Sequence, residues 1–316
     1  MKRLALLFAL LPALLGAAAC SHSARPAQAA PAPAADTLTS APGLELPLPT
    51  VPSTLTDPAA RAGYIAAHFW DGLNFADTLR SHSRDFMEQN FANYVSVLRL
   101  ANLEEMRPAV ASLVRCAEAD SAACELLGDV ADKYLYDPNS PMLSEPLYEL
   151  FLAPLLESPC IDVTKKLRLT EQRASIALNR PGTLAADFTY EGRDGSRLTL
   201  RRTPSAPRML LVFFDPDCEH CAEIMKAYAQ EPLLARLIAD GRLTLLAVYA
   251  DGDRSLWQKA LAEMPQAWQL GFDLTGVQEQ GLYNLRAMPS IYVLDADKRV
   301  LLKDVQPEAA LDFLSR

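Results

Sequence analysis

Hydrophobic positions between about residues 57 and 179 recur every three or four residues, which is the period of an amphipathic helix. One such face is formed by Met87, Phe91, Tyr94, Leu98 and Ala101. Turn-forming residues such as Pro138, Asn139 and Pro141 separate further helical stretches. These stretches are residues 103–117, 121–135, 144–156 and 163–178. The pattern predicts an all-α domain, and no catalytic constellation is visible within it.

From about residue 180 the pattern changes to short strands that alternate with helices. Residues 209–214 and 243–249 are continuous apolar runs, which are typical of strands buried on both faces of a sheet. Hairpins are predicted within residues 188–200 and 290–303, and helices over residues 218–229, 233–239, 255–263, 276–283 and 307–315. We expect helices on both faces of a mixed central sheet. The whole chain is therefore predicted to be a two-domain α+β protein, all-α first and α/β second.

The first 20 residues have the parts of an export signal. Lys2 and Arg3 precede an apolar stretch, residues 4–15, which is too short to span a bilayer as a mature helix. The small residues that follow lead to Ala17-Ala18-Ala19-Cys20, which resembles the lipobox of bacterial lipoproteins, with Ala17 where Leu is usual. The resemblance implies that Cys20 carries a lipid and anchors the chain to a membrane in the periplasm. An ordinary secretory signal is the alternative, and both place the mature protein outside the cytoplasm.

Composition supports two folded domains joined to a tether. Residues 21–55 are rich in Ala, Pro, Ser and Thr without an apolar period, so we expect a disordered linker there. The predicted organisation is a signal peptide over residues 1–20, the linker over 21–55, a helical domain over 56–180 and an α/β domain over 181–316. With 316 residues, half of them hydrophobic, the chain can bury two cores. A net charge of −9 without a basic run argues against nucleic-acid binding.

Two cysteines, Cys218 and Cys221, stand where the predicted strand 209–214 gives way to a helix. A thiol at a helix N-terminus faces unpaired backbone amides and the positive end of the helix dipole, which favour the thiolate. A spacing of three residues brings both sulfurs to the same end of the helix. Cys218 is therefore predicted to attack a partner disulfide, and Cys221 to resolve the mixed disulfide that forms.

The stretch from about residue 181 to 316 resembles the thioredoxin superfamily, particularly the periplasmic thiol-disulfide oxidoreductases of the TlpA and ResA type. The likeness rests on Cys218-Glu219-His220-Cys221 after a buried strand, on residues 182–188 and the turn at residues 194–195, and on Ala287-Met288-Pro289-Ser290 before a hairpin. It implies that the Met288–Pro289 bond is cis and that this loop faces the cysteines. It also implies that Met288 and Pro289 bind an extended substrate segment. We expect exported proteins as substrates and no cofactor.

Departures from the family pattern leave the direction of electron flow open. Asp217 stands where the family usually has Trp, and Asp215 and Glu219 add negative charge that opposes thiolate formation. His220 acts in the other direction, since a histidine at this position also occurs in oxidising members such as DsbA and in disulfide isomerases, where it stabilises the reduced thiolate. Ile224 occupies the position of the family's glutamate. A reductase would need a membrane electron donor as a partner.

Other interpretations of the cysteines remain. Cys218 and Cys221 could form a structural disulfide or half of a metal site, but zinc would need two more ligands, and we expect no metal. Cys116, Cys124 and Cys160 belong to the predicted helical domain, where we expect Cys116 and Cys124 to form a structural disulfide. The competing function is an adaptor lipoprotein whose helical domain captures a partner while the second domain is redox-silent. A peroxidase is disfavoured because Asp215 replaces the threonine of peroxidase relatives.

Overall fold

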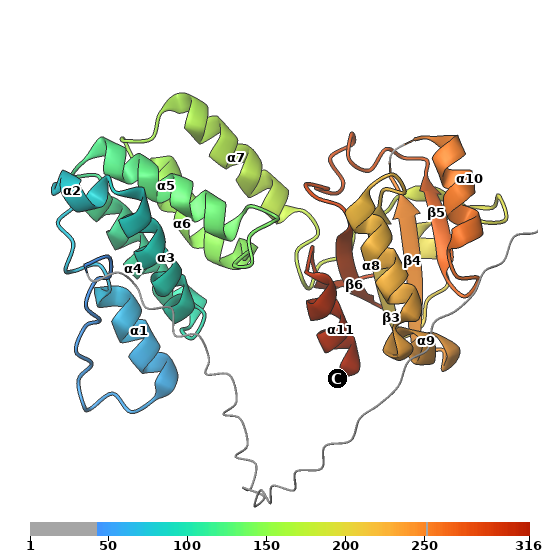
Figure 1. The fold of residues 1–316 in the computed structure, drawn as a ribbon, viewed down its shortest axis with the longest axis horizontal. Helices are drawn as coiled ribbons and strands as arrows, with labels where there is room; N and C mark the ends of the chain where they lie inside the picture. Colours follow the sequence, from blue (N-terminus) through green and yellow to red (C-terminus); the bar gives the residue numbers. More distant parts are fainter. Residues whose placement is uncertain (1–42, 251) are drawn as a thin grey trace, which may run out of the picture. The chain divides into compact units, whose positions relative to one another are not determined.

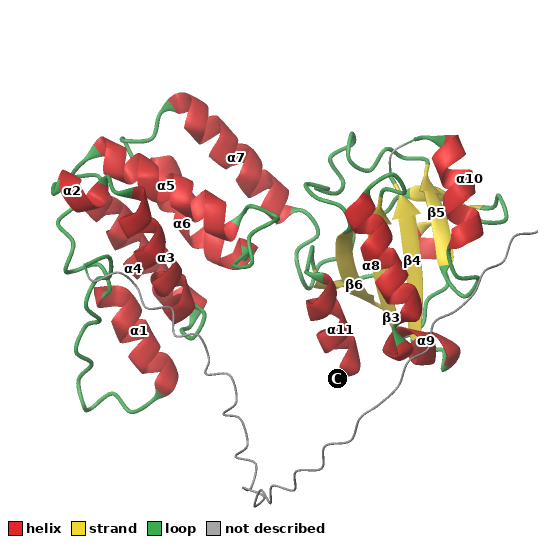
Figure 2. Ribbon diagram, in the orientation of Figure 1, coloured by secondary structure: helices red, strands yellow, loops and turns green. Residues whose placement is uncertain are grey.

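The computed structural model describes residues 43–250 and 252–316, which belong to one compact unit. The predicted signal peptide, Cys20 and most of the predicted linker lie outside the described residues. Helices occupy the first part of the described chain and the strands follow in the second part (Figure 1, Figure 2). Among the described residues, no helix is long and apolar enough to cross a membrane.

The helical domain confirms the predicted helical period. Its elements are α1 (Pro58–His68), α2 (Thr78–Ser81), α3 (Arg84–Leu98), α4 (Leu103–Ala117), α5 (Ser121–Leu135), α6 (Glu145–Glu157) and α7 (Val163–Ala177). Most begin at a side chain that accepts a hydrogen bond from a first-turn backbone N–H, as Ser83 does for α3 and Asp120 for α5. In the predicted apolar face, Met87, Phe91, Tyr94 and Leu98 are fully buried in the core of this domain, and Ala101 packs against it partly exposed.

The end of the predicted linker packs against the helical domain instead of being disordered. Leu46 is buried, and its backbone N–H donates a hydrogen bond of 2.7 Å to the side-chain oxygen of Asn90. The amide nitrogen of Asn90 donates in turn to the carbonyl oxygen of Leu44 at 2.8 Å. Asn90 is completely buried in α3, so its polar groups require such partners. The prediction of disorder up to residue 55 is therefore wrong for residues 44–46.

The α/β domain contains a mixed sheet of seven strands, in agreement with the predicted fold class. The strands are β1 (Thr189–Gly192), β2 (Arg197–Thr199), β3 (Arg208–Phe214), β4 (Leu243–Tyr249), β5 (Gln269–Asp273), β6 (Ser290–Asp295) and β7 (Val300–Leu302), in the order β2-β1-β5-β4-β3-β6-β7. β3 lies near the middle, parallel to β4 and antiparallel to β6. The sequence analysis missed β5, a short run interrupted by Gly271.

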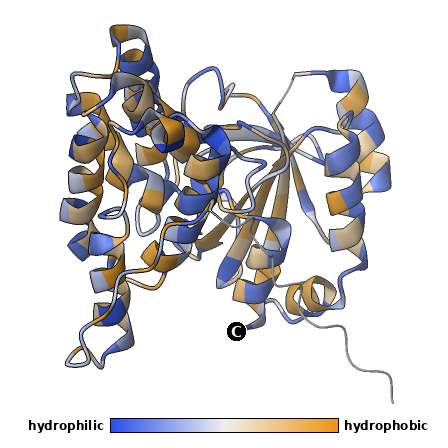
Figure 3. Cartoon of the chain, turned by 60° about the vertical axis from the view of Figure 1, so that its left-hand side comes forward, coloured by the Kyte–Doolittle hydropathy of each residue, from blue (hydrophilic) through white to orange (hydrophobic). Residues whose placement is uncertain are grey.

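The helices of this domain all contribute to the core on one face of the sheet. They are α8 (Glu219–Gln230), α9 (Pro232–Ala239), α10 (Arg254–Glu263) and α11 (Pro307–Ser315). Their buried residues share a core with alternate β3 residues, Leu210, Val212 and Phe214. The strands are coloured largely as hydrophobic in Figure 3, as expected for a sheet that is covered on both sides.

Loops cover the second face of the sheet, so the prediction of helices on both faces is wrong. Met209, Leu211 and Phe213 of β3 pack there against Phe188 and Tyr283. Residues 276–283, predicted as a helix, form turns. Gly276 and Gly281 have positive φ angles of 74° and 63°, outside the helical region of the backbone. The carboxylate of Asp273 accepts hydrogen bonds from the N–H groups of Thr275 and Val277, which fixes the turn.

Candidate redox site

Cys218 is the residue that caps the N-terminus of α8. Its backbone is extended, and its sulfur accepts a hydrogen bond from the backbone N–H of Cys221 at 3.4 Å. The turn before it is held by Asp215, whose side chain accepts from the N–H of Asp217 at 2.9 Å and whose carbonyl oxygen accepts from the N–H of Cys218 at 3.2 Å. The strand β3 therefore delivers a half-buried sulfur to the first turn of a helix, where backbone N–H groups are unpaired.

Cys221 lies one helical turn further and is completely buried. Burial raises the pKa of its thiol from 9.0 to about 12, because a thiolate loses its hydration there. Both cysteines are free thiols in this structure. One sulfur is thus accessible at a helix N-terminus, and the other is kept protonated in the core beneath it.

His220, between the two cysteines, is directed towards solvent. Its side chain is 64% exposed, and its Nδ1 atom lies 4.0 Å from a carboxylate oxygen of Glu223. Asp217, Glu219 and Glu223 are exposed on the same turn, with Lys226 one helical turn beyond. The surface around the accessible sulfur is therefore predominantly acidic.

The Met288–Pro289 peptide bond is cis, as the family resemblance implies. Met288 is half-buried and packs, as Cys218 does, against the core cluster that contains Cys221. His220, Met288 and Pro289 line a common hollow of about 240 Å³. The fold therefore brings His220 together with the two residues predicted to bind substrate.

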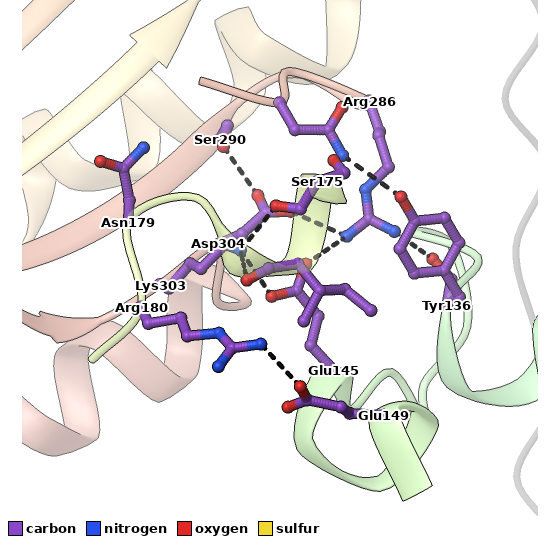
Figure 4. A network of polar contacts seen from close by, with 12 residues as sticks. Tyr136, Glu145, Glu149, Ser175, Asn179, Arg180, Arg286, Ser290, Lys303 and Asp304 are labelled. Carbon is purple, nitrogen blue, oxygen red and sulfur yellow. Dashed lines mark hydrogen bonds and ion pairs between the residues drawn. The ribbon is translucent and has the colours of Figure 1, made fainter. Parts of the chain in front are cut away.

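A charged network that the sequence analysis missed holds this loop from both sides. Arg286 precedes the cis bond by two residues and Ser290 follows it directly. The side chain of Asp304 pairs with Arg286 at 3.3 Å and accepts a hydrogen bond from the Ser290 hydroxyl at 2.7 Å. Figure 4 shows these residues gathered around Asp304. The loop that contains the cis bond is thus fastened at both ends to one carboxylate.

The same network reaches the helical domain through Glu145 at the start of α6. Its carboxylate lies 3.2 Å from Arg286 and 2.7 Å from the ammonium group of Lys303 (Figure 4). The guanidinium of Arg286 also stacks 3.9 Å from the centre of the Tyr136 ring. Burial raises the pKa of Glu145, since loss of hydration outweighs the nearby positive charges. A sequence signal existed in Arg286, a charge placed two residues before the candidate cis bond, but its partners lie far away in the chain.

The cysteines of the helical domain do not form the predicted disulfide. Cys116 is exposed, whereas Cys124 is completely buried, and both are free thiols. Cys124 faces the core, where its sulfur lies 3.6 Å from the Ser158 hydroxyl and burial raises its pKa to about 11. The side chains point into different environments, so an eight-residue separation does not bring them together. No group of three or more His, Cys, Asp or Glu side chains among residues 43–250 and 252–316 is arranged to hold a metal ion.

Comparisons with known proteins found matches for both domains. A family model described as a domain of unknown function (DUF5106) matches residues 19–179. No curated protein matches the chain. The crystal structure of a thioredoxin-like protein from Bacteroides caccae is similar with a TM-score of 0.79 and 34% sequence identity, over 85% of this chain and 97% of that one.

Two further structures match the chain over a shorter part. A conserved protein of unknown function from Bacteroides fragilis is 38% identical, with a TM-score of 0.41, over 43% of this chain and 98% of that one. A putative thiol:disulfide interchange protein from Chlorobium tepidum is 25% identical, with a TM-score of 0.36, over 44% of this chain and 96% of that one.

The match to the Bacteroides caccae protein covers 85% of this chain and so includes both domains. The family model matches the helical domain independently. The α/β domain has the features of a thioredoxin-like fold, namely the mixed sheet, the cysteine pair and the cis-proline loop. The chain therefore belongs to the thioredoxin-like family, as a member that carries a DUF5106 domain ahead of its thioredoxin-like fold.

Proposed function

We propose that the protein is an extracytoplasmic, membrane-tethered thiol-disulfide oxidoreductase that exchanges disulfides in exported proteins through Cys218 and Cys221. The observation that carries the proposal is the position of the Cys218 sulfur, which caps α8 one helical turn before the buried Cys221, in a domain whose Met288–Pro289 bond is cis. A half-buried sulfur that receives a backbone hydrogen bond is suited to act as a nucleophile.

The exchange consists of two displacements at sulfur. The Cys218 thiolate attacks one sulfur of a partner disulfide, a mixed disulfide forms, and the other partner sulfur leaves as a thiolate. Cys221 then loses its proton and attacks Cys218, which releases the second partner sulfur. The partner gains two electrons and two protons, and the protein is left with a Cys218–Cys221 disulfide. The reverse sequence oxidises a partner dithiol.

The test is a redox titration of the purified protein in glutathione buffers, followed by thiol alkylation and mass spectrometry. A reversible Cys218–Cys221 couple is expected, and Cys218→Ser should abolish reduction of insulin disulfides. A potential near roughly −270 mV would identify a reductase that needs a membrane electron donor, and one near roughly −120 mV an oxidase or isomerase. No reversible couple at any potential would refute the enzyme proposal.

The membrane tether is tested separately at Cys20. In a bacterial host, the unaltered protein should be found in the membrane fraction, whereas Cys20→Ala should prevent lipid attachment and release mature protein from the membrane. Mass spectrometry of the N-terminal peptide measures the lipid directly. Equal membrane retention of both forms would contradict the proposed anchor.

The alternative is an adaptor that binds a partner through its helical domain. Val163 and Leu167, one helical turn apart on α7, have exposures of 75% and 62%. Large apolar side chains on one exposed helix face are typical of binding surfaces. Partner binding that survives a Cys218→Ser, Cys221→Ser double variant, together with an absent redox couple, would favour the adaptor.

A further inference from the structure

The hollow beside the cis-proline loop has walls from both domains. The α/β domain supplies His220, Met288 and Pro289. The helical domain supplies Asn139 and Leu143, from the loop between α5 and α6. The volume of about 240 Å³ suits a side chain of a bound polypeptide rather than a folded surface. Residues that were predicted only as a turn thus border the proposed substrate site.

The α5–α6 loop is held in place by local hydrogen bonds. The Asp137 carboxylate accepts from the backbone N–H of Asn139 at 2.8 Å, and the Ser140 hydroxyl donates to the carbonyl oxygen of Tyr134 at 2.6 Å. Arg99, the residue that follows α3, donates to the carbonyl oxygen of Met142 at 2.9 Å. Arg286, next to the cis-proline loop, donates to the carbonyl oxygen of Tyr136. The two walls are therefore fixed against each other rather than loosely apposed.

The opposite wall offers unused backbone groups. Within the described part of the chain, no hydrogen bond involves the backbone of Ala287 or Met288, although both residues are half-buried. Backbone N–H and C=O groups that a bound chain covers are normally paired. An extended polypeptide that lies along this loop would supply the missing partners, as in recognition by strand addition.

The charges around the hollow determine which side chain fits. The carboxylate of Asp304, on the border of the hollow, is already paired with Arg286 and Ser290. Apart from Asp304, the only residue lining the hollow that could carry a charge is His220, and its ring is directed to solvent. A charged side chain that entered would lose hydration without gaining a partner, so an uncharged one is favoured.

We propose that the α5–α6 loop is part of the substrate site and that the hollow receives an uncharged side chain next to the reactive cysteine of an extended polypeptide. This inference rests on the proposed thiol-disulfide exchange. The helical domain then selects which exported polypeptides present a disulfide to Cys218. Asn139 and Leu143 are specificity-determining residues, because they contact the polypeptide and not the sulfurs.

The test compares disulfide-linked peptides that differ only in the residue beside the cysteine, which is Leu, Ala or Asp. The full-length protein should favour Leu over Asp by about tenfold in kcat/KM. Asn139→Trp fills the hollow, and it should lower kcat/KM for the Leu peptide by about tenfold through KM. The unaltered protein is also assayed with 2-hydroxyethyl disulfide, which is too small to reach the hollow, and the dithiol potential of each variant shows whether its cysteine pair is intact.

Asn74→Trp is the matched control, since Asn74 is an exposed turn residue of the same domain. It should behave as the unaltered protein with every substrate. Asn139→Lys places a positive charge in the hollow and should shift the preference towards the Asp peptide, which a folding defect could not do. Unchanged peptide preference in both Asn139 variants would overturn the inference.

Failure of the proposed function can be told apart from failure of this inference. If the protein turned over neither peptides nor 2-hydroxyethyl disulfide, the exchange chemistry would be refuted. The role of the hollow in binding could still be tested with a Leu peptide whose cysteine is replaced by Ser. Fluorescence anisotropy would measure how tightly this peptide binds. Binding weakened about tenfold by Asn139→Trp supports the site, and equal binding contradicts it.

Discussion

At the scale of single residues, the two cysteines of the pair differ in environment although they are three positions apart. Cys218 receives a backbone hydrogen bond at the start of α8, whereas Cys221 is enclosed by the core. Thiol reactivity depends on access and on the fraction of thiolate, so this difference should be directly measurable.

Alkylation of the reduced, folded protein with iodoacetamide should label Cys218 and the exposed Cys116 at pH 8 and spare Cys221. With a pKa of about 12, only about one Cys221 thiol in ten thousand is a thiolate at pH 8. Its labelling rate should rise about tenfold for each pH unit until the pKa is reached. Mass spectrometry of tryptic peptides measures the labelling.

Unfolding provides the control for this experiment. In denaturant the surroundings of the thiols are lost, so all of these cysteines should be labelled at similar rates. Labelling of folded Cys221 as fast as Cys218 at pH 8 would contradict the burial on which its assigned role depends.

Local motifs were enough to identify Cys218, Cys221 and the Met288–Pro289 bond from the sequence. They could not identify the network around Asp304, because its members come from α6, the cis-proline loop and the strand end after β7. Charged residues so far apart in the chain become partners only once the two domains are folded. The same reason explains why Asn139 and Leu143 were recognised only as residues near a turn.

At the scale of elements, β5 illustrates how a small residue can hide a strand. Gly271 lies opposite Gly192 of β1, and a Cβ atom added to it would lie 2.7 Å from a ring carbon of Tyr190. The Tyr190 ring is buried and its hydroxyl is hydrogen-bonded to Thr203 at 2.7 Å, so it cannot move aside easily. Gly271 therefore allows β5 to pair beside Tyr190, but it also interrupts the run of hydrophobic residues from which a strand would be predicted.

Gly271→Ala should therefore lower the free energy of unfolding by about 1–3 kcal/mol through overpacking. Gly128→Ala is the matched control, because its new Cβ atom would lie 3.6 Å from Leu155, which is ordinary contact. Alanine in the interior of α5 should stabilise the protein by about 0.5–1 kcal/mol. Urea unfolding followed by circular dichroism measures both values, and equal midpoints for the two variants would contradict the expectation.

The turn that replaces the predicted helix at residues 276–283 was hidden for a related reason. Val277 and Tyr283 are both buried, but they are six residues apart, which is not the three- or four-residue spacing of one helix face. The positive φ angles of Gly276 and Gly281 and the cap by Asp273 decide against the helix. Apolar residues are buried by well-packed loops as well as by helices, so their presence alone does not predict a helix.

At the scale of the whole molecule, the two domains are joined by ion pairs that are shielded from water. The side chains of Glu145, Arg286 and Lys303 are 14%, 13% and 5% exposed. Removal of one member of a buried ion pair leaves the others without compensation, which costs more than the pair itself contributes.

Glu145→Gln should therefore lower the free energy of unfolding by about 3 kcal/mol. It should also separate the unfolding of the two domains into distinct calorimetric transitions. Glu104→Gln is the control, since Glu104 pairs with Arg107 while 75% exposed, and such pairs contribute about 0–1 kcal/mol. A single transition at the unaltered temperature in Glu145→Gln would show that these ion pairs do not couple the domains.

The position of Glu145 also limits how such a chain can be recombined in evolution. A thioredoxin-like segment that is transferred without its helical domain keeps both cysteines and the cis proline, but Arg286 and Lys303 then lose their shared acidic partner. A new neighbour would have to supply a carboxylate at the same place, or these cations would have to be replaced. The two domains are therefore expected to be inherited as a pair.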